Sequence, residues 1–342
     1  MPIESIIVFR FSAMGDVAMV SPVLKQLIAH HPQVKIILVS RQAFQPFFDD
    51  LPNVIFHPIF PKDKHKGFQG LYKLFKELRA YKPALIADLH DNIRSRVLSS
   101  FFRITGVKIK RIDKGRSNKK KLTRKKHKIF LPLQSTFDRY AEVFYALGYP
   151  FTLQKKLEKQ DRNIPSIFAG HFLPSSPPKI GIAPFAQHIY KMYPLDLMEQ
   201  VIISLSKKYQ LFIFGGGEKE EIVGSEWEKK YDQVTNAIGK INLSQELDLI
   251  ANLDLMLSMD SSGMHLASLV GTKVVSIWGP THPYAGFLGF GQRDSDCIQI
   301  DHPARPSSIY GNKPCLCDGK PCIELISPLM VINKIESILN YG

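Results

Sequence analysis

The sequence predicts an α/β protein made of two Rossmann-like halves with a cleft between them. Short apolar, β-branched runs alternate with longer amphipathic segments, which is the order expected of βαβ units in a parallel sheet. The pattern lapses once, near the middle of the chain, and a second alternating series then begins. The 342 residues also exceed the roughly 250–300 at which a single hydrophobic core stops growing, so two domains are expected.

The first series contains four predicted strands and four predicted helices. The strands are expected at 6–10, 35–39, 53–57 and 84–88, each a short run rich in Ile, Leu and Val. A Gly-Asp turn at 15–16 leads into a helix that ends near residue 30. Further helices are expected at 67–81, 92–102 and 136–147, the last of them capped by Gly148.

The second series follows a segment rich in Pro and Ser at 163–178, which is the best candidate for a linker. Strands are expected at 179–183, 211–214, 255–259 and 273–277, and helices at 194–209, 218–230, 261–270 and 328–339. The predicted domains are therefore 1–165 and 166–326. The last segment, 327–342, is expected to be a helix that packs back on the N-terminal domain.

Ligands of such sheets bind beyond the carboxyl ends of the strands, and the first polar motif lies at the end of the first strand. It runs from Phe11 to Val17, and Gly15 in it lets the backbone approach a ligand closely. Asp16 is a carboxylate at the mouth of the expected cleft. A helix N-terminus favours its ionised form, so it is a weak base at rest that can accept a proton late in a displacement. Simple capping of the helix is the alternative.

Two further motifs end strands in the second half. Asp260-Ser261-Ser262-Gly263-Met264-His265 places small polar residues at a helix start, where backbone N–H groups hold a phosphate or diphosphate. The alternative is that Asp260 or Ser261 only caps the helix. Lys191 precedes a helix that begins with Pro194, and its ammonium could neutralise a phosphate leaving group; a solvated surface lysine is the alternative.

Several other motifs are weak or missing. Gly215-Gly216-Gly217-Glu218 follows a strand but is not the G-x-G-x-x-G of dinucleotide-binding proteins, and Gly279-Pro280-Thr281-His282-Pro283 is a further strand-end turn. No P-loop, HExxH, GxSxG or kinase motif occurs. The cysteines, at positions 297, 315, 317 and 322, have no standard zinc spacing. Reduced thiols are expected, with structural zinc that includes Cys297, or a disulfide, as alternatives.

The charge of the chain is concentrated in one segment. Residues 108–128 carry twelve Lys or Arg against one acid, Asp113, and so account for +11 of the net charge of +14. Such a run suits a phosphate-bearing partner, which includes nucleic acid, an anionic membrane and a phosphorylated substrate, or it is a solubilising loop. No apolar run approaches the ~20 residues of a membrane helix. The first five residues lack the basic start of a signal peptide, so we expect a cytoplasmic protein.

Four blocks of sequence resemble one family, the bacterial heptosyltransferases of lipopolysaccharide core synthesis, glycosyltransferase family 9. These blocks are IIVFRFSAMGDVAMVSPVLKQL at 6–27, ADLHDNIRSRVLS at 87–99, IAPFAQHIYKMYP at 182–194 and INLSQELDLIANLDLMLSMDSSGMHLASLVGTKVVSIWGPTHP at 241–283. They occur in the family's order and span almost the whole chain. The resemblance implies a GT-B fold, in which two Rossmann-like domains face each other across a cleft. It also implies a metal-independent, inverting transfer of heptose from ADP-heptose to an inner-core sugar, with no cofactor.

The resemblance assigns roles residue by residue. Asp16 matches the general base and Lys191 the lysine at the donor phosphates. The residues that match or fall near donor-binding positions are Ser12, Ala13, Gly15, Gln187, Glu218, Ile241, Asp260, Ser261, Ser262, Gly263 and His265. The chain departs from the family's pattern at Ala186 and Gln187, where small hydroxyl residues are usual, and at Ser261-Ser262, where Thr-Gly or Ser-Gly is usual. The reaction class is unaffected, while the identity of the donor is less firmly implied.

The resemblance also implies partners for the basic segment. Lys119, Lys120, Lys121, Arg124, Lys125 and Lys126 are expected to meet a phosphorylated acceptor of the lipid A–Kdo type at the anionic cytoplasmic face of the inner membrane. The protein would then be a peripheral membrane enzyme. A relative with another nucleotide-sugar or acceptor is the first alternative, and a non-catalytic sugar-binding relative is another. A nucleic-acid-binding protein is the alternative of a different class, but residues 108–128 contain no aromatic side chain for base stacking, so nucleic acid is not expected.

Overall fold

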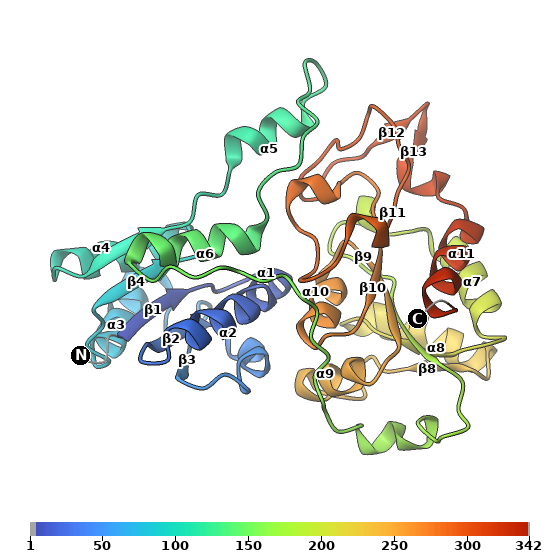
Figure 1. The fold of residues 1–342 in the computed structure, drawn as a ribbon, viewed down its shortest axis with the longest axis horizontal. Coiled ribbons are helices and arrows are strands. Elements are labelled where there is room, and N and C mark those ends of the chain that lie inside the picture. Colours follow the sequence, from blue (N-terminus) through green and yellow to red (C-terminus); the bar gives the residue numbers. More distant parts are fainter. Residues whose placement is uncertain (1–4, 341–342) are drawn as a thin grey trace. The chain divides into compact units, whose positions relative to one another are not determined.

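The computed structural model describes residues 5–340, so the expectations for residues 1–4 and for 341–342 lie outside the described residues. The chain forms two compact units (Figure 1). The first contains the residues up to Lys114 together with Ser135–Gln154, and the second contains Gly115–Gln134 together with the residues from Lys155 onward. Each unit is built on a parallel sheet, which confirms the predicted α/β class with two Rossmann-like parts.

The sheet of the first unit has the strand order β3-β2-β1-β4-β5, and all its neighbouring strands are parallel. The strands are β1 (Ser5–Phe9), β2 (Lys35–Ser40), β3 (Val54–Pro58), β4 (Leu85–Asp88) and β5 (Lys108–Arg111). Strand β1 is fully buried along its length, as a central strand covered on both faces should be. Four of the five strands match their predicted positions within two residues, and β5 was not predicted.

Helices cover both faces of this sheet. They are α1 (Met14–Ala18), α2 (Val20–His30), α3 (Gly67–Arg79), α4 (Ile93–Ile104) and α6 (Thr136–Leu147). Leu74 of α3 and Phe102 of α4 share one buried core with alternate residues of the strands, such as Ile7 and Phe9. Helices α2 and α6 pack on each other, and α6 also packs on β4. The predicted first helix is broken at Met19 into α1 and α2.

The sheet of the second unit has the order β11-β10-β9-β6-β7-β8 and is also parallel throughout. Its strands are β6 (Lys179–Ala183), β7 (Gln210–Ile213), β8 (Val234–Asn236), β9 (Leu255–Met259), β10 (Val274–Ile277) and β11 (Cys297–Ile298). Numbered within the unit, this is the 3-2-1-4-5-6 order of a dinucleotide-binding Rossmann fold. A separate antiparallel pair, β12 (Leu316–Cys317) and β13 (Lys320–Pro321), lies near the C-terminus.

The helices of the second unit are α5 (Arg116–Thr123), α7 (Leu195–Leu205), α8 (Glu218–Lys230), α9 (Leu243–Ala251), α10 (Ser262–Leu269) and α11 (Pro328–Leu339). Val201 of α7, Trp227 of α8 and Val331 of α11 share the main core with the sheet. Helix α11 packs within the second unit, on α7, and its apolar positions belong to the core of that unit. That it also packs back on the N-terminal domain stays a prediction. Among the described residues, no helix is both long and apolar enough to span a bilayer.

Two segments belong to a different part of the fold from the one that the sequence predicted. Residues 163–178, the expected linker, pack on the second sheet, because the rings of Phe168 and Phe172 each lie 5.7 Å from that of Phe212 in β7. The chain changes units at 154–155 instead. The second is Gly115–Gln134, which was assigned to the N-terminal domain but belongs to the second unit; for example, the Leu133 N–H donates to the Tyr284 carbonyl at 2.8 Å.

Candidate functional site

Each sheet has a point where the direction of winding reverses, and the candidate residues lie there. In the first unit the reversal is between β1 and β4, and in the second it is between β6 and β9. The chain leaves the carboxyl ends of these neighbouring strands toward opposite sides, which opens a crevice in which ligands bind. Asp16 follows β1, whereas Lys191 follows β6 and Asp260 follows β9. The topology therefore supports all three positions independently of any motif.

The site of the first unit is centred on an ion pair between Asp16 and Arg10. The Arg10 guanidinium is 2.6 Å from Asp16 Oδ2, and the side chain of Arg10 is 9% exposed against 32% for Asp16. Asp16 is the third residue of α1, and its Oδ2 also accepts the Ala13 N–H at 3.4 Å. The predicted capping role is therefore real, but the carboxylate remains partly exposed. Ser12, Ala13 and Gly15 are partly or fully exposed in the same turn.

Two neighbours that the sequence did not single out fix this turn. The Tyr140 hydroxyl of α6 donates to the Asp16 carbonyl at 3.2 Å, and its ring lies 5.8 Å from the Arg10 guanidinium carbon. Nδ1 of His90, which follows β4, accepts the Phe11 N–H at 2.9 Å. Burial and the nearby Arg10 charge lower the pKa of His90 to about 3, so this imidazole is neutral. The only sequence signal for Arg10 was that it ends an apolar strand.

The site of the second unit is centred on an ion pair between Lys191 and Asp260. The Lys191 ammonium is 2.9 Å from Asp260 Oδ2, and the side chains are 15% and 8% exposed. The Asp260 N–H donates to the Ile277 carbonyl of β10 at 3.1 Å, which fixes the backbone of this residue. The two motifs that the sequence placed 69 residues apart thus converge on one point.

The stem of Lys191 rests against the backbone of Gly311. A Cβ at Gly311 would lie 2.1 Å from Lys191 Cγ and 2.2 Å from Cδ, so any larger residue here would have to displace the Lys191 side chain. Gly311 also has a φ of 76°, a left-handed conformation that favours glycine. Its N–H donates to the Ser308 hydroxyl at 2.9 Å. Sequence reasoning missed this contact, because nothing in a loop sequence shows which distant side chain a glycine touches.

The start of α10 combines exposed and closely packed residues. Ser261 is the N-cap, and its own N–H donates to the Met259 carbonyl at 2.7 Å. The N–H groups of the residues that follow it, in the first turn of α10, have no acceptor within the helix. Gly263 is buried, and a Cβ there would lie 2.6 Å from Ala183 Cβ, so this glycine is needed for the approach of α10 to β6. Ser262 and His265 are partly exposed.

The remaining predicted donor residues lie on separate loops of the second unit. Gln187 is exposed in the loop after β6, Glu218 is exposed at the first position of α8, and Ile241 lies just before α9, partly exposed. Within residues 5–340, no hydrogen bond or ion pair joins any of them to the Lys191–Asp260 pair. Glu220 is the carboxylate that holds the glycine loop, because its Oε2 accepts the Gly216 N–H at 2.7 Å.

The basic segment divides into exposed and buried residues. Lys120, Lys121, Arg124, Lys125 and Lys126 are exposed, as expected of a surface that meets an anionic partner. Lys119 is only 8% exposed. Its ammonium lies over the Phe287 ring at 4.4 Å, a cation–π contact that holds α5 on the second unit. The expectation that Lys119 meets the acceptor or the membrane is therefore wrong, since its charge is already engaged inside the unit.

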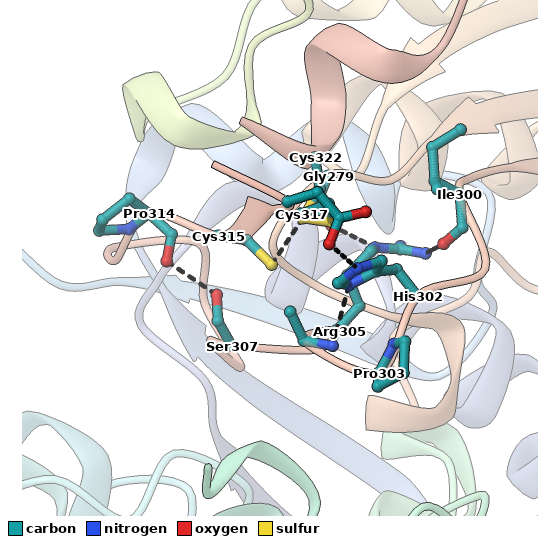
Figure 2. The surroundings of a disulfide bond; sticks show 12 residues. Gly279, Ile300, His302, Pro303, Arg305, Ser307, Pro314, Cys315, Cys317 and Cys322 are labelled. Atoms are coloured by element: carbon teal, nitrogen blue, oxygen red, sulfur yellow. Dashed lines mark hydrogen bonds and ion pairs between the residues drawn. A yellow bond between two sulfur atoms is a disulfide. The ribbon is translucent and has the colours of Figure 1, made fainter. Parts of the chain in front are cut away.

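The cysteines form one buried group and one separate thiol. Cys317 and Cys322 form a disulfide, and Cys315 lies next to it as a buried thiol (Figure 2). The expectation of four reduced thiols is thus wrong for the structure. Cys297 lies in β11, where its Sγ is 3.6 Å from the Ser276 hydroxyl, and it does not belong to the group. Within residues 5–340, Cys315, Cys317 and Cys322 are the one group of three or more His, Cys, Asp or Glu side chains found close enough to hold a metal ion.

Comparison with known proteins gives concordant results. The sequence model of "Glycosyltransferase family 9 (heptosyltransferase)" matches residues 71–302. The chain is 25% identical over 291 residues to the lipopolysaccharide core heptosyltransferase OpsX of Haemophilus influenzae, which covers 82% of this chain and 80% of that protein.

Solved structures share the fold over the whole chain. The ADP-heptose LPS heptosyltransferase II of Escherichia coli superposes with a TM-score of 0.69 at 20% identity, covering 99% of both chains. A family 9 glycosyl transferase of Veillonella parvula superposes with a TM-score of 0.76 at 20% identity, covering 100% of this chain and 99% of that one.

Proposed function

The chain belongs to glycosyltransferase family 9, and on this premise we propose that it transfers a heptose from ADP-heptose to an inner-core sugar of a lipopolysaccharide precursor. The observation that carries the proposal is the Lys191–Asp260 pair at the reversal point of the second sheet. An ammonium beside the start of a helix suits the diphosphate of a nucleotide-sugar. The relatives named as heptosyltransferases of lipopolysaccharide support the choice of sugar and acceptor.

In this proposal Asp16 is the general base. Its carboxylate takes the proton of the acceptor hydroxyl while that oxygen attacks the anomeric carbon of the heptose. The bond from that carbon to the diphosphate oxygen breaks in the same displacement, so the configuration inverts and ADP leaves with the electron pair. One carboxylate suffices, because no covalent sugar–enzyme intermediate forms.

Lys191 and the first amides of α10 stabilise the departing ADP. The Asp260 carboxylate holds the ammonium in place at 2.9 Å, and the Gly311 backbone confines its stem. Negative charge that develops on the leaving diphosphate would then meet a fixed positive charge and backbone donors. These groups do the work that a metal ion does in other transferases, so we propose that transfer needs no metal.

Nucleotide-sugar specificity is the direct test of this function. We expect ADP to raise the melting temperature of the protein and UDP and GDP to leave it unchanged. We also expect release of ADP from ADP-heptose in the presence of a Kdo-bearing lipid A acceptor. Turnover with another nucleotide-sugar, and none with ADP-heptose, would keep the reaction class and replace the donor.

The basic segment carries the second part of the proposal, which is binding to the anionic cytoplasmic face of the inner membrane. Five exposed basic residues on and after α5 are followed by Ile129 and Leu131, whose side chains are 41% and 62% exposed. Basic charges attract anionic lipid at about 1 kcal/mol each, and apolar side chains can enter the interface. An acceptor embedded in that membrane would be met at the same surface.

A charge-matched pair of variants tests this part. Lys120, Lys121 and Lys125 are replaced by Gln in one protein, and the exposed Lys62, Lys66 and Lys73 of the first unit are replaced by Gln in the other. We expect the first variant alone to lose binding to phosphatidylglycerol vesicles and to show a higher KM for the lipid acceptor, with ADP binding unchanged. Equal losses of vesicle binding in both variants would show that the basic segment acts only through the net charge of the protein. Salt-sensitive binding to DNA or RNA that exceeds vesicle binding would favour a nucleic-acid partner.

A further inference from the structure

The three buried cysteines lie on a hairpin that brings their sulfur atoms together. Strands β12 and β13 pair antiparallel, and Asp318 and Gly319, with φ angles of 50° and 84°, form the turn between them. Two consecutive positive φ angles and an Asp-Gly sequence are typical of a type I′ hairpin turn. Cys315 directly precedes β12 and Cys317 ends it, and side chains two residues apart along a strand project to the same face. Cys322 follows the other strand, and its N–H donates to the Cys315 carbonyl at 2.9 Å.

A third sulfur atom, that of Cys315, lies in contact with the disulfide. Cys315 Sγ lies 2.9 Å from Cys322 Sγ, and the ligand atoms of all three cysteines lie within 4.8 Å of one another. Thiolates around a tetrahedral Zn²⁺ lie about 2.3 Å from the ion, which places the sulfur atoms roughly 3.8 Å apart. A disulfide alone does not require a third sulfur in contact with it. Reduction of the disulfide frees two sulfur atoms beside the third, and these three thiolates can then open from their present contacts to the separation that one ion requires.

Two cations beside the cysteines, the buried Arg305 and the partly buried Lys128, form no ion pair with a carboxylate of the described residues. Arg305 is 3% exposed, and all its hydrogen bonds go to neutral oxygens. The acceptors are the carbonyls of Trp278, Gly279, Thr281 and Ile300 and the Gln299 side chain. The Lys128 ammonium likewise donates to three backbone carbonyls, those of Pro303, Arg305 and Pro306. Among the described residues no ion pair joins either cation to a carboxylate.

A cluster of thiolates would supply the missing negative charge. Burial lowers the pKa values of both Lys128 and Arg305, and a charged Cys315 acts in the opposite direction on each, as Asp301 also does on Arg305. Three thiolates with one divalent ion carry a net charge of −1, which complements the two cations. The site also has an entry path, since Cys315 and Cys322 line a cavity of about 560 Å³ together with Pro314 and Pro321.

We propose that Cys315, Cys317 and Cys322, when reduced, form a structural site for one thiophilic divalent metal ion, Zn²⁺ or Fe²⁺. A dithiol reductant transfers two electrons and two protons to the disulfide and is itself oxidised to a disulfide. The metal ion then displaces the three thiol protons and binds the three sulfur atoms. The ion holds the β12–β13 hairpin, lies on the second unit with Lys128 and Arg305 beside it, and takes no part in sugar transfer. The disulfide is the oxidised, metal-free form of the same site.

Metal analysis of the full-length protein tests the site. After purification under a reducing, oxygen-free atmosphere, we expect about one Zn or Fe per chain by mass spectrometry, and the element found distinguishes the two. Cys315→Ser and Cys317→Ser should lose the metal. Cys297→Ser should keep the metal, because the Cys297 thiol lies outside the cluster, in hydrogen-bond contact with the Ser276 hydroxyl. A protein that retains metal in Cys315→Ser contradicts the assignment.

A second measurement does not depend on the variants folding. We expect Co²⁺ added to the reduced, metal-free wild-type protein to give an intense thiolate-to-cobalt charge-transfer absorption. Prior oxidation of the protein should abolish that absorption, and alkylation with mass spectrometry should then find Cys317 and Cys322 protected. Absence of both bound metal and the cobalt absorption in fully reduced protein would overturn the proposal and leave the disulfide as the only link in the hairpin.

Discussion

The two units have the same sheet topology at their reversal points but present opposite charges there. In the first unit the cation is the buried partner, with Arg10 9% exposed and Asp16 32% exposed. In the second the carboxylate is the buried partner, with Asp260 8% exposed and Lys191 15% exposed. The more exposed group is therefore a carboxylate in the first unit and an ammonium in the second. In both cases the buried partner fixes the position of the presented group.

This difference shows how one architecture can serve two halves of a transfer reaction. A carboxylate can accept the proton that a sugar hydroxyl loses when it attacks, whereas an ammonium can stabilise the negative charge that develops on a leaving diphosphate. The buried partner of each pair is expensive to leave alone, because removal of one member of a buried pair leaves an uncompensated charge. Variants of each pair should therefore separate chemistry from donor binding.

The largest effect is expected for Asp16→Asn. The amide keeps the size of the side chain but cannot accept the acceptor's proton, so we expect kcat to fall by about 10²–10⁴-fold while the Kd for ADP stays unchanged. Asp138→Asn is the matched control, because Asp138 also lies in the first turn of a helix of the first unit and accepts from the N-cap Ser135, at 2.7 Å. Turnover near wild type in Asp16→Asn would remove the base from the mechanism.

A smaller effect, of a different kind, is expected for Lys191→Met. Methionine keeps an unbranched stem but loses the ammonium, and the Asp260 carboxylate that remains repels phosphate. A charged hydrogen bond contributes about 1.5–3 kcal/mol, so ADP should bind roughly 10–100-fold more weakly. Lys208→Met is the control, since Lys208 is also ion-paired in the second unit, with Glu336 at 2.7 Å, but on its α7–α11 side. Equal ADP affinity in wild type and Lys191→Met would contradict the role of this lysine.

The two units should also lose stability together in acid, because each contains a buried neutral histidine. Burial lowers the pKa of His90 to about 3 and that of His282 to about 4. Between these values and about 6.5 the unfolded chain binds a proton that the folded chain excludes, so the free energy of unfolding falls as pH drops. At pH 5 the loss is about 2 kcal/mol for each histidine. Urea unfolding between pH 7.5 and 5 measures it, and His90→Gln should flatten the slope; an unchanged slope would assign the acid sensitivity to other groups.

The smallest effect is expected for Gly311→Ala, which alters a single contact of the Lys191 side chain. A Cβ there displaces the stem of Lys191, so we expect the Kd for ADP to rise by about 3- to 10-fold, less than on loss of the charge itself. Gly106→Ala is the matched control, because Gly106 also has a positive φ, 84°, but has no atom near its Cβ position. Both variants place a Cβ on a residue with a positive φ, so the backbone strain is similar. A weaker ADP affinity in Gly311→Ala than in Gly106→Ala would therefore be due to the displaced Lys191.

The sequence predicted most of the fold where the apolar periodicity was strong. Strands β6 and β9 and helices α6, α8 and α11 have the predicted limits. Strand β5 escaped prediction because its sequence, KIKR, is short and charged, which is typical of a protected edge strand. Residues 115–134 join the second unit through Lys119 and Leu133, and contacts between residues so far apart in the chain leave no local pattern.

The sequence singled out the central residues of the candidate site but not their surroundings. Asp16, Lys191 and Asp260 were singled out because polar residues at the carboxyl ends of strands are unusual and because their motifs resemble those of a family. Their roles stay a prediction. Arg10 and Gly311, which fix Asp16 and Lys191, were missed. Ion pairs and close packing depend on the strand order and on loop paths, and neither can be read from a single sequence. The cysteine hairpin was missed for the same reason.

The division of roles between the two ion pairs is tested most directly by the dissociation constant for ADP, measured by calorimetry side by side in wild type, Asp16→Asn and Lys191→Met. We expect unchanged affinity in Asp16→Asn and a roughly 10–100-fold loss in Lys191→Met, because the proposed function assigns the donor phosphates to Lys191 alone of these two residues. Loss of ADP affinity in Asp16→Asn, with wild-type affinity in Lys191→Met, would contradict the division of roles between the two ion pairs.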